Sequence, residues 1–182
     1  MTSSSRDTAE RLTRAVRDWL ATLDGDQRPA ATFPFEGDER FVWAFTPGDR
    51  RGLALRDMDA TQRDAAMAIL TAAMSPRGAR ETAAVIALES VLCEIERSVG
   101  RPGWQRRDPE LYWFAVFGDP SSSDPWMWRV GGHHVAIHDT VAGGEVIGSS
   151  PSFLGANPAV VPEGRPRAGE RTLPGEELFA RA

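Results

Sequence analysis

The sequence predicts an α+β protein, in which N-terminal helices pack against an antiparallel β-sheet that contains a hairpin of tryptophan and histidine residues. Two observations lead to this prediction. In the first hundred residues, apolar side chains recur every three or four positions, as they do in amphipathic helices. From residue 111 onward the apolar runs become short, aromatic and β-branched, and two Gly-Gly pairs interrupt them, which is typical of strands joined by tight turns.

Three helices are expected before residue 100. The first covers residues 7–23, where Asp7 and the glutamate three positions later form a capping-box pattern. The second begins after Asp59 and ends at the Ser-Pro-Arg-Gly break at 75–78. The third and longest covers residues 79–99. Because so short a break separates the second helix from the third, these two are expected to form an antiparallel pair.

Four segments are expected to contribute strands. The apolar run Phe41–Phe45 is predicted to be a buried strand, and residues 52–55 a second short one. Residues 111–117 are aromatic and β-branched, and residues 126–150 repeat this pattern over a length that suits three strands. Together these strands would form the sheet that the helices cover.

Length and composition indicate a single globular domain over residues 1–182, with residues 174–182 beginning a further helix. The chain has one cysteine, Cys93, and neither a signal-peptide pattern nor an apolar run long enough to span a membrane. We therefore expect a cytoplasmic protein with no membrane partner. Its formal net charge is -5 and its basic residues are scattered, so no nucleic-acid partner is expected either.

The chain contains no lysine, and all 21 of its basic residues are arginine. Schiff-base catalysis and the lysine of a phosphate-binding P-loop are thereby excluded. The sequence also lacks a dinucleotide-binding glycine fingerprint and a serine in a nucleophile-elbow context. The concentrated chemistry of the chain is its three histidines, which all lie between positions 133 and 138.

These histidines fall within the predicted three-stranded segment. If Gly131-Gly132 forms the first turn, Arg129 faces His134 across the hairpin. Successive residues of a strand point to opposite faces of a sheet. One face would then be apolar, with Trp126, Trp128, Val130, His133, Val135 and Ile137. The other would be polar, with Arg129, His134, His138 and, from the second hairpin, Ser149. Such a polar face is either a solvated surface or the floor of a pocket, and the sequence leaves both open.

Clustered histidines suggest metal binding or acid–base chemistry. On a regular strand, however, His134 and His138 would lie about 13 Å apart, at about 3.3 Å per residue. Ligands of one metal ion lie about 2 Å from it, and His133 would point to the opposite face. A divalent metal held by His133 or His134 would therefore need further ligands from elsewhere in the chain.

Glu89 lies at the edge of the apolar stripe of the longest predicted helix. A carboxylate at the boundary of a core is either a functional acid or, more commonly, the partner of an arginine. Glu89 is therefore a candidate for a supporting role beside the histidines.

Several stretches of the chain resemble the family catalogued as domain of unknown function 3500. The stretches are Asp26–Arg28, Arg40–Trp43, Ala87–Glu89, Tyr112–Pro120, Pro125–His134 and Pro151–Pro158. The resemblance implies no activity. It implies longer relatives, of which this chain would match the N-terminal part only, and an asparagine where this chain has His138. It therefore favours His133 and His134 over His138 as site residues.

Three hypotheses for function follow. In the first, the protein is an enzyme acting on a small molecule, with His134, Arg129 and Glu89 as catalytic residues and with His133 and His134 as candidate ligands of a divalent metal. In the second, the same sheet surface is a non-catalytic ligand-binding module. In the third, the chain is a truncated, inactive remnant. The sequence leaves open the reaction, the substrate, the cofactor and the oligomeric state.

Overall fold

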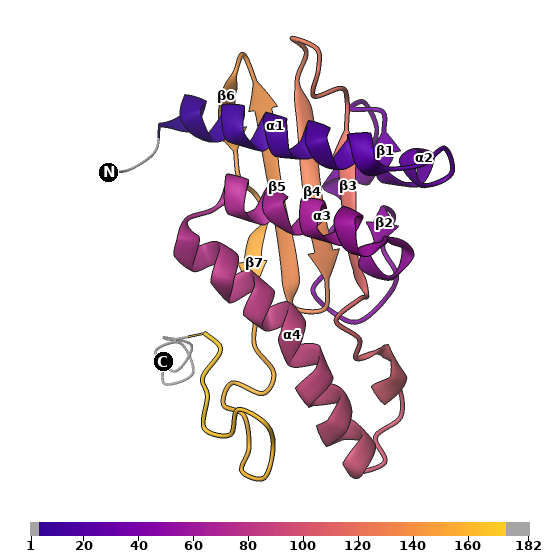
Figure 1. Cartoon of the computed structure of the whole chain (residues 1–182), viewed down its shortest axis with the longest axis vertical. Coiled ribbons are helices and arrows are strands. Elements are labelled where there is room, and N and C mark those ends of the chain that lie inside the picture. The colour runs from indigo at the N-terminus through magenta and orange to yellow at the C-terminus, as the bar shows by residue number, and fades with distance from the viewer. Residues whose placement is uncertain (1–3, 174–182) are drawn as a thin grey trace.

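The computed structural model describes residues 4–173, in which helices cover one face of a seven-stranded sheet (Figure 1). The helical elements are α1 (Ser5–Thr22), α2 (Gln27–Ala31), η1 (Asp38–Phe41), η2 (Leu55–Asp57), α3 (Ala60–Ala73), α4 (Pro76–Ser98) and η3 (Trp104–Arg106). The strands are β1 (Thr32–Phe33), β2 (Leu53–Ala54), β3 (Tyr112–Phe117), β4 (Trp126–Gly132), β5 (Val135–Ala142), β6 (Glu145–Gly148) and β7 (Ser152–Leu154). The predicted α+β class is confirmed, while the helix expected at 174–182 lies outside the described residues.

The long helices begin where the sequence supplies a capping side chain. Ser4 caps α1 and forms a capping box with Asp7, so this box starts three residues earlier than predicted. Asp59 caps α3, as predicted, and exchanges hydrogen bonds with Gln62. Ser75 caps α4, and a proline follows it in the first turn, where the missing N–H costs no hydrogen bond.

α1 and α3 lie side by side across the sheet and run in opposite directions (Figure 1). Their apolar faces join the sheet in one core, which includes Leu12, Val16, Ile69, Leu70, Phe114, Trp126 and Trp128. α4 begins beside the end of α3 and then runs obliquely away from it (Figure 1). The second and third predicted helices thus run in roughly opposite directions but are not packed along their whole length. The partner of α3 is α1, because both helices bury their apolar sides on the sheet.

The sheet is mixed, with the strand order β1-β3-β4-β5-β6. β2 shares an edge of β3 with β1, and β7 shares an edge of β5 with β6. β1 runs parallel to β3, whereas the other pairs among the described strands are antiparallel. Residues 126–150 supply three strands, as predicted, and the Gly143-Gly144 turn joins the last two.

The first hairpin differs from the prediction in its turn and in its register. The turn is His133-His134 rather than Gly131-Gly132, and Arg129 pairs with His138 rather than with His134. The two registers differ by an even number of residues, so the side chains of β4 and β5 keep their predicted faces. The histidines at positions 133 and 134, however, leave the faces of the sheet and lie at the end of the hairpin.

The aromatic ring of Tyr112 explains why the two glycines are not the turn. Tyr112 lies on β3 directly opposite Gly132 of β4, and a Cβ atom at Gly132 would be only 2.4 Å from its ring. A glycine is therefore needed within the strand. His134 takes the left-handed conformation that the turn requires, with a φ of 61°. The hairpin tip thus consists of two imidazole-bearing residues.

Around Arg129 and Gly131 the second face of the sheet is covered by residues 38–51, which we call the strap. Phe33 and Phe35 pack on another part of this face. The buried strand predicted at Phe41–Phe45 is wrong, because the strap is irregular there and its large side chains point outward. Phe41 is 63% and Trp43 47% exposed. The Val42 and Ala44 carbonyl groups accept hydrogen bonds from arginine side chains, and the Phe45 carbonyl accepts a single one from the His134 N–H, so no sheet ladder orders this segment.

The strap buries the face of the sheet that the sequence predicts to be polar. Arg129 and His138 are only 3% and 2% exposed, so this face is neither a solvated surface nor an open pocket floor. Ser149 does not lie opposite His138 either. The pairing of β5 with β6 ends before it, and the Ser149 hydroxyl bonds to the Asp139 carboxylate.

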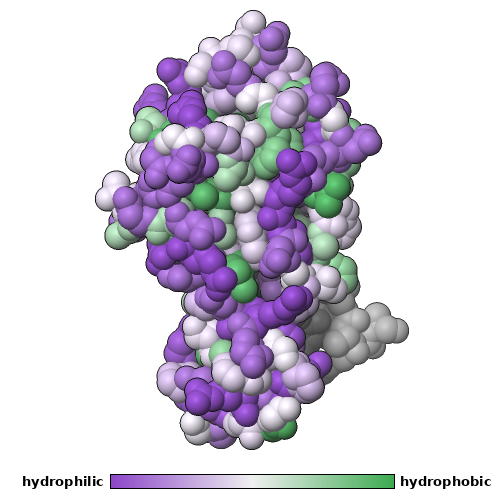
Figure 2. Space-filling view, turned by 90° about the vertical axis from the view of Figure 1, so that its right-hand side faces the viewer, coloured by the Kyte–Doolittle hydropathy of each residue, from purple (hydrophilic) through white to green (hydrophobic). Residues whose placement is uncertain are grey.

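The surface that the described residues form in Figure 2 has no extended hydrophobic patch that would mark a binding site. On the side of the molecule shown in Figure 2, hydrophobic residues form small groups separated by hydrophilic ones. Within residues 4–173, no helix combines the length and the hydrophobicity needed to cross a membrane.

Candidate functional site

Arg129 makes all of its described hydrogen bonds to the strap, and its guanidinium also lies over the Phe117 ring of β3. Its guanidinium donates hydrogen bonds to the carbonyl groups of Glu39, Val42 and Arg51 at 2.8–3.0 Å, and a fourth to the Glu39 carboxylate at 2.9 Å. Four of the five N–H donors of Arg129 are thus engaged by the protein, which leaves the predicted role in orienting an anionic substrate little support. Arg129, a candidate catalytic residue in the sequence analysis, anchors the strap to the sheet in the structure.

His138 lies directly across the hairpin from Arg129 and is buried with it. Its Nε2 has no hydrogen-bond partner among residues 4–173. Burial, together with repulsion from the Arg129 guanidinium, lowers the pKa of His138 to about 4. His138 is therefore neutral at pH 7.

Glu89 and His133 come together although they are 44 residues apart in the chain. The Glu89 carboxylate on α4 lies 2.5 Å from His133 Nδ1 at the tip of the hairpin. Both side chains are buried, at 3% and 8% exposed. The Tyr112 hydroxyl of β3 donates a hydrogen bond to the His133 carbonyl at 2.8 Å, which helps to fix the turn. Of the predicted site residues, these two form the closest functional pair.

The ring of His133 contacts two planar groups. His134 stacks on it with 3.8 Å between ring centroids. Nη1 of Arg107 lies 3.4 Å from each of the two ring nitrogens, which places the guanidinium over the ring rather than in its plane. His134 and Arg107 together therefore restrict the orientation of the His133 ring.

Sequence reasoning missed Arg107 and its partner Glu96. Arg107 donates two hydrogen bonds to the Glu96 carboxylate, at 2.8 and 3.1 Å. These hydrogen bonds hold the pKa of Glu96, which is 2% exposed, below its usual range. The signal was present in the spacing, because Glu96 follows Glu89 by seven residues and both lie on one side of α4.

His134 takes part in the site through its backbone hydrogen bonds and through the stacking of its ring on His133. Its N–H donates to the Phe45 carbonyl of the strap at 2.8 Å, and its own carbonyl accepts from Gly155 N–H at 2.9 Å. Burial, with smaller repulsion from His133 and Arg107, lowers the pKa of His134 to about 4. His133, which pairs with Glu89, is the other histidine that could take the base role predicted for His134.

A small hollow lies beside the Glu89–His133 pair. Its other walls are the strap at Pro47–Asp49, the segment that leads into β3, and Trp113. The room left for water is about 20 Å³, which suffices for one molecule. Oε2 of Glu89 is buried and has no hydrogen-bond partner among residues 4–173. Because a buried, unpaired carboxylate oxygen is costly, this atom calls for a donor from a ligand or from water.

Arg106 adds a free positive charge to the same hollow. It lines the hollow, is exposed, and makes no side-chain hydrogen bond or ion pair with any residue in the described range. The neighbouring Arg107 is already engaged by Glu96. Arg106 is therefore the guanidinium that can bind an anionic group there.

The donor set does not extend to a metal centre. Within residues 4–173, no three side chains of histidine, cysteine, aspartate or glutamate converge as metal ligands. The prediction that His133 and His134 hold a divalent metal thus finds no third ligand in the described part of the chain.

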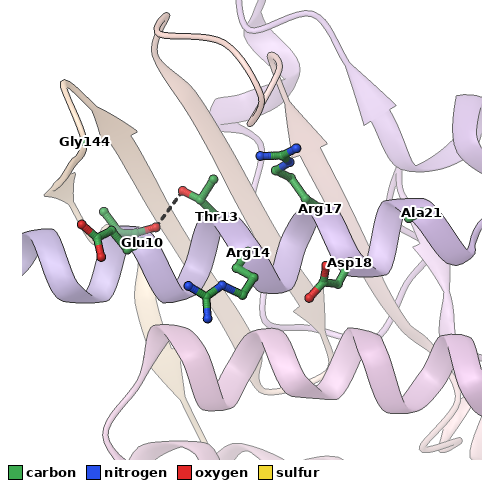
Figure 3. Close-up of a pocket in the computed structure, with 8 residues that line it drawn as sticks. Glu10, Thr13, Arg14, Arg17, Asp18, Ala21 and Gly144 are labelled. Atoms are coloured by element: carbon green, nitrogen blue, oxygen red, sulfur yellow. Dashed lines mark hydrogen bonds between the residues drawn. The ribbon is translucent and has the colours of Figure 1, made fainter.

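A larger hollow, of about 540 Å³, lies on the outer side of α1 near the turn between β5 and β6 (Figure 3). Figure 3 shows charged side chains of both signs along it, including Glu10, Arg14, Arg17 and Asp18. It contains none of the histidines, and its side chains lie on the exposed side of the helix. We regard it as a surface groove without catalytic groups.

Comparisons with known proteins bear on family rather than on chemistry. A family model described as "Protein of unknown function (DUF3500)" matches residues 5–182, which is nearly the whole chain. No curated protein and no solved structure matches it. The resemblance seen in the sequence is confirmed.

Proposed function

The chain belongs to the DUF3500 family, whose description gives no activity, and we propose from its geometry that it is a hydrolase of small acyl esters or amides. The observation that carries this proposal is the buried Glu89–His133 pair at 2.5 Å, beside a hollow with room for one water molecule.

His133 is the general base of the proposed reaction. Glu89 accepts the hydrogen bond from Nδ1–H, which fixes the tautomer and leaves Nε2 to take a proton. The stacked partners His134 and Arg107 prevent the ring from turning. A base held in one orientation loses little entropy when it meets its substrate.

The proposed step transfers one proton twice. A water molecule attacks the carbonyl carbon of the substrate and gives its proton to Nε2 of His133. The bond from carbon to the leaving oxygen or nitrogen then breaks, and the same proton passes from Nε2 to the leaving group. Arg106 stabilises the negative charge that develops on the carbonyl oxygen in between.

The test is a panel of chromogenic acyl esters and anilides incubated with the purified protein at a series of pH values from 5 to 7.5. We expect turnover of at least one probe above the spontaneous rate, and a loss of about 100-fold or more in both H133Q and E89Q. The matched control is E94Q, because Glu94 also lies on α4 but pairs with Arg165 on the surface. E94Q should retain the wild-type rate.

Two outcomes would overturn the proposal. One is the absence of turnover for every probe. The other is a probe that raises the melting temperature of wild type and H133Q equally without being hydrolysed, which would favour a non-catalytic binding module.

A further inference from the structure

The strap closes the hollow, and this limits what can reach His133. Pro47–Asp49 of the strap form one wall, and the remaining room holds about one water molecule. An acyl ester is several times larger than water. If the proposed function is correct, the strap must move before a substrate can bind.

The strap is organised as one unit. Inside it, the Arg50 guanidinium donates hydrogen bonds to the carbonyl groups of Ala44, Thr46 and Gly48. At its ends stand Gly37 and Gly52, whose φ angles of 140° and 135° lie where side chains are disfavoured. A segment stiff in the middle and bounded by two glycines can lift without losing its internal bonds.

Few hydrogen bonds hold the strap against the sheet. Arg129 provides the four already described, and His134 N–H provides one to Phe45. Arg129 is thus the main polar attachment between β4 and the strap.

His138 lies next to this attachment and is the titratable group best placed to weaken it. The charged groups packed around it are Arg129 from β4 and, beyond that side chain, Glu39, Arg50 and Arg51 of the strap. From the β7 side it meets the Pro151 carbonyl, which accepts its backbone N–H. Glu39 is the one carboxylate in this group, so a proton on His138 would add a positive charge to a site that already has an excess of them.

We propose that the strap is a lid on the Glu89–His133 hollow, that Arg129 is its latch, and that protonation of His138 releases it. The lid has a role in catalysis only if the proposed hydrolase function is correct. The opening itself depends only on contacts between the strap and the sheet. The lid is closed at neutral pH and opens in mild acid.

The sign of the effect follows from the pKa of His138. In the closed state this pKa is about 4, whereas a histidine in water titrates near 6.5. Closure therefore weakens as the pH falls from about 6.5 towards 4. With the ordinary histidine value in the open state, the opening equilibrium rises roughly 20-fold between pH 7 and pH 5.

Two hydrogen bonds of one residue provide the test. His134 N–H is bonded to the strap, while the His134 carbonyl is bonded to Gly155 N–H in the body of the protein. Amide exchange, corrected for its intrinsic pH dependence, should show His134 losing about 20-fold of its protection between pH 7 and pH 5. Gly155 should lose little.

Variants separate the parts of the latch. H138F should keep His134 N–H protected at pH 5. H134N removes the other imidazole of low pKa and should leave the acid-induced opening unchanged, as measured by exchange of the backbone amide at position 134. R129K cannot serve four acceptors, so it should expose this amide already at pH 7 while Gly155 stays protected. The proposal fails if both amides lose protection together, or if H138F opens like wild type. Because no substrate is present, this outcome is independent of the hydrolase test.

Discussion

Replacing Gly132 by alanine is expected to destabilise the protein by about 2–4 kcal/mol, because a buried ring occupies the space of the new methyl group. A Cβ atom at this position would lie 2.4–2.9 Å from three carbon atoms of the Tyr112 ring. That ring is 0% exposed, and its hydroxyl holds the His133 carbonyl. Because the Tyr112 ring is buried and hydrogen-bonded, a shift of this ring would also displace the His133-His134 turn.

Gly131 is the matched control. It is adjacent in the same strand, and the nearest atom to its Cβ position is Arg50 Cγ at an ordinary contact distance of 3.8 Å. G131A should therefore change stability by about 0.5 kcal/mol or less. Thermal denaturation measures both, since 3 kcal/mol corresponds to roughly 6–12 °C in a chain of this size. Equal melting temperatures for G131A and G132A would contradict the packing that we describe.

Removing the Arg107 guanidinium is expected to cost about 3–5 kcal/mol at pH 7, because it leaves a buried carboxylate without its main partner. In R107M, Glu96 would keep, among residues 4–173, the exposed Arg101 at 3.5 Å as its ion-pair partner. In the wild type the pKa of Glu96 is lowered by Arg107, so this stabilisation is complete above the ordinary carboxyl pKa and is lost as the pH falls through the folded value.

The difference between wild type and R107M should therefore shrink as the pH is lowered from 7 to 3. Urea denaturation at a series of pH values measures it. The control is R77M, because Arg77 also belongs to α4 but makes an exposed ion pair with Glu81, which should be worth about 0.5 kcal/mol or less. A constant gap across pH, or an R107M variant as stable as R77M, would show that the Glu96–Arg107 pair does not stabilise the fold.

The sequence by itself determined the features that depend on local periodicity. Alternation placed the tryptophans of β4 on the core side of the sheet, and an even shift in register left that assignment correct. Capping residues marked the starts of α3 and, within three residues, of α1. Glu89 was singled out by its place at the edge of an apolar helix face.

Tertiary structure decided everything that depended on a distant partner. The turn moved to His133-His134 because Tyr112, on another strand, needs the space above Gly132. The segment at 41–45 left the sheet because arginine side chains bind its carbonyl groups. Likewise, Arg129 became a buried anchor and His133, not His134, met Glu89, since a carboxylate 44 residues away can only be assigned once the helix is seen to cross the hairpin.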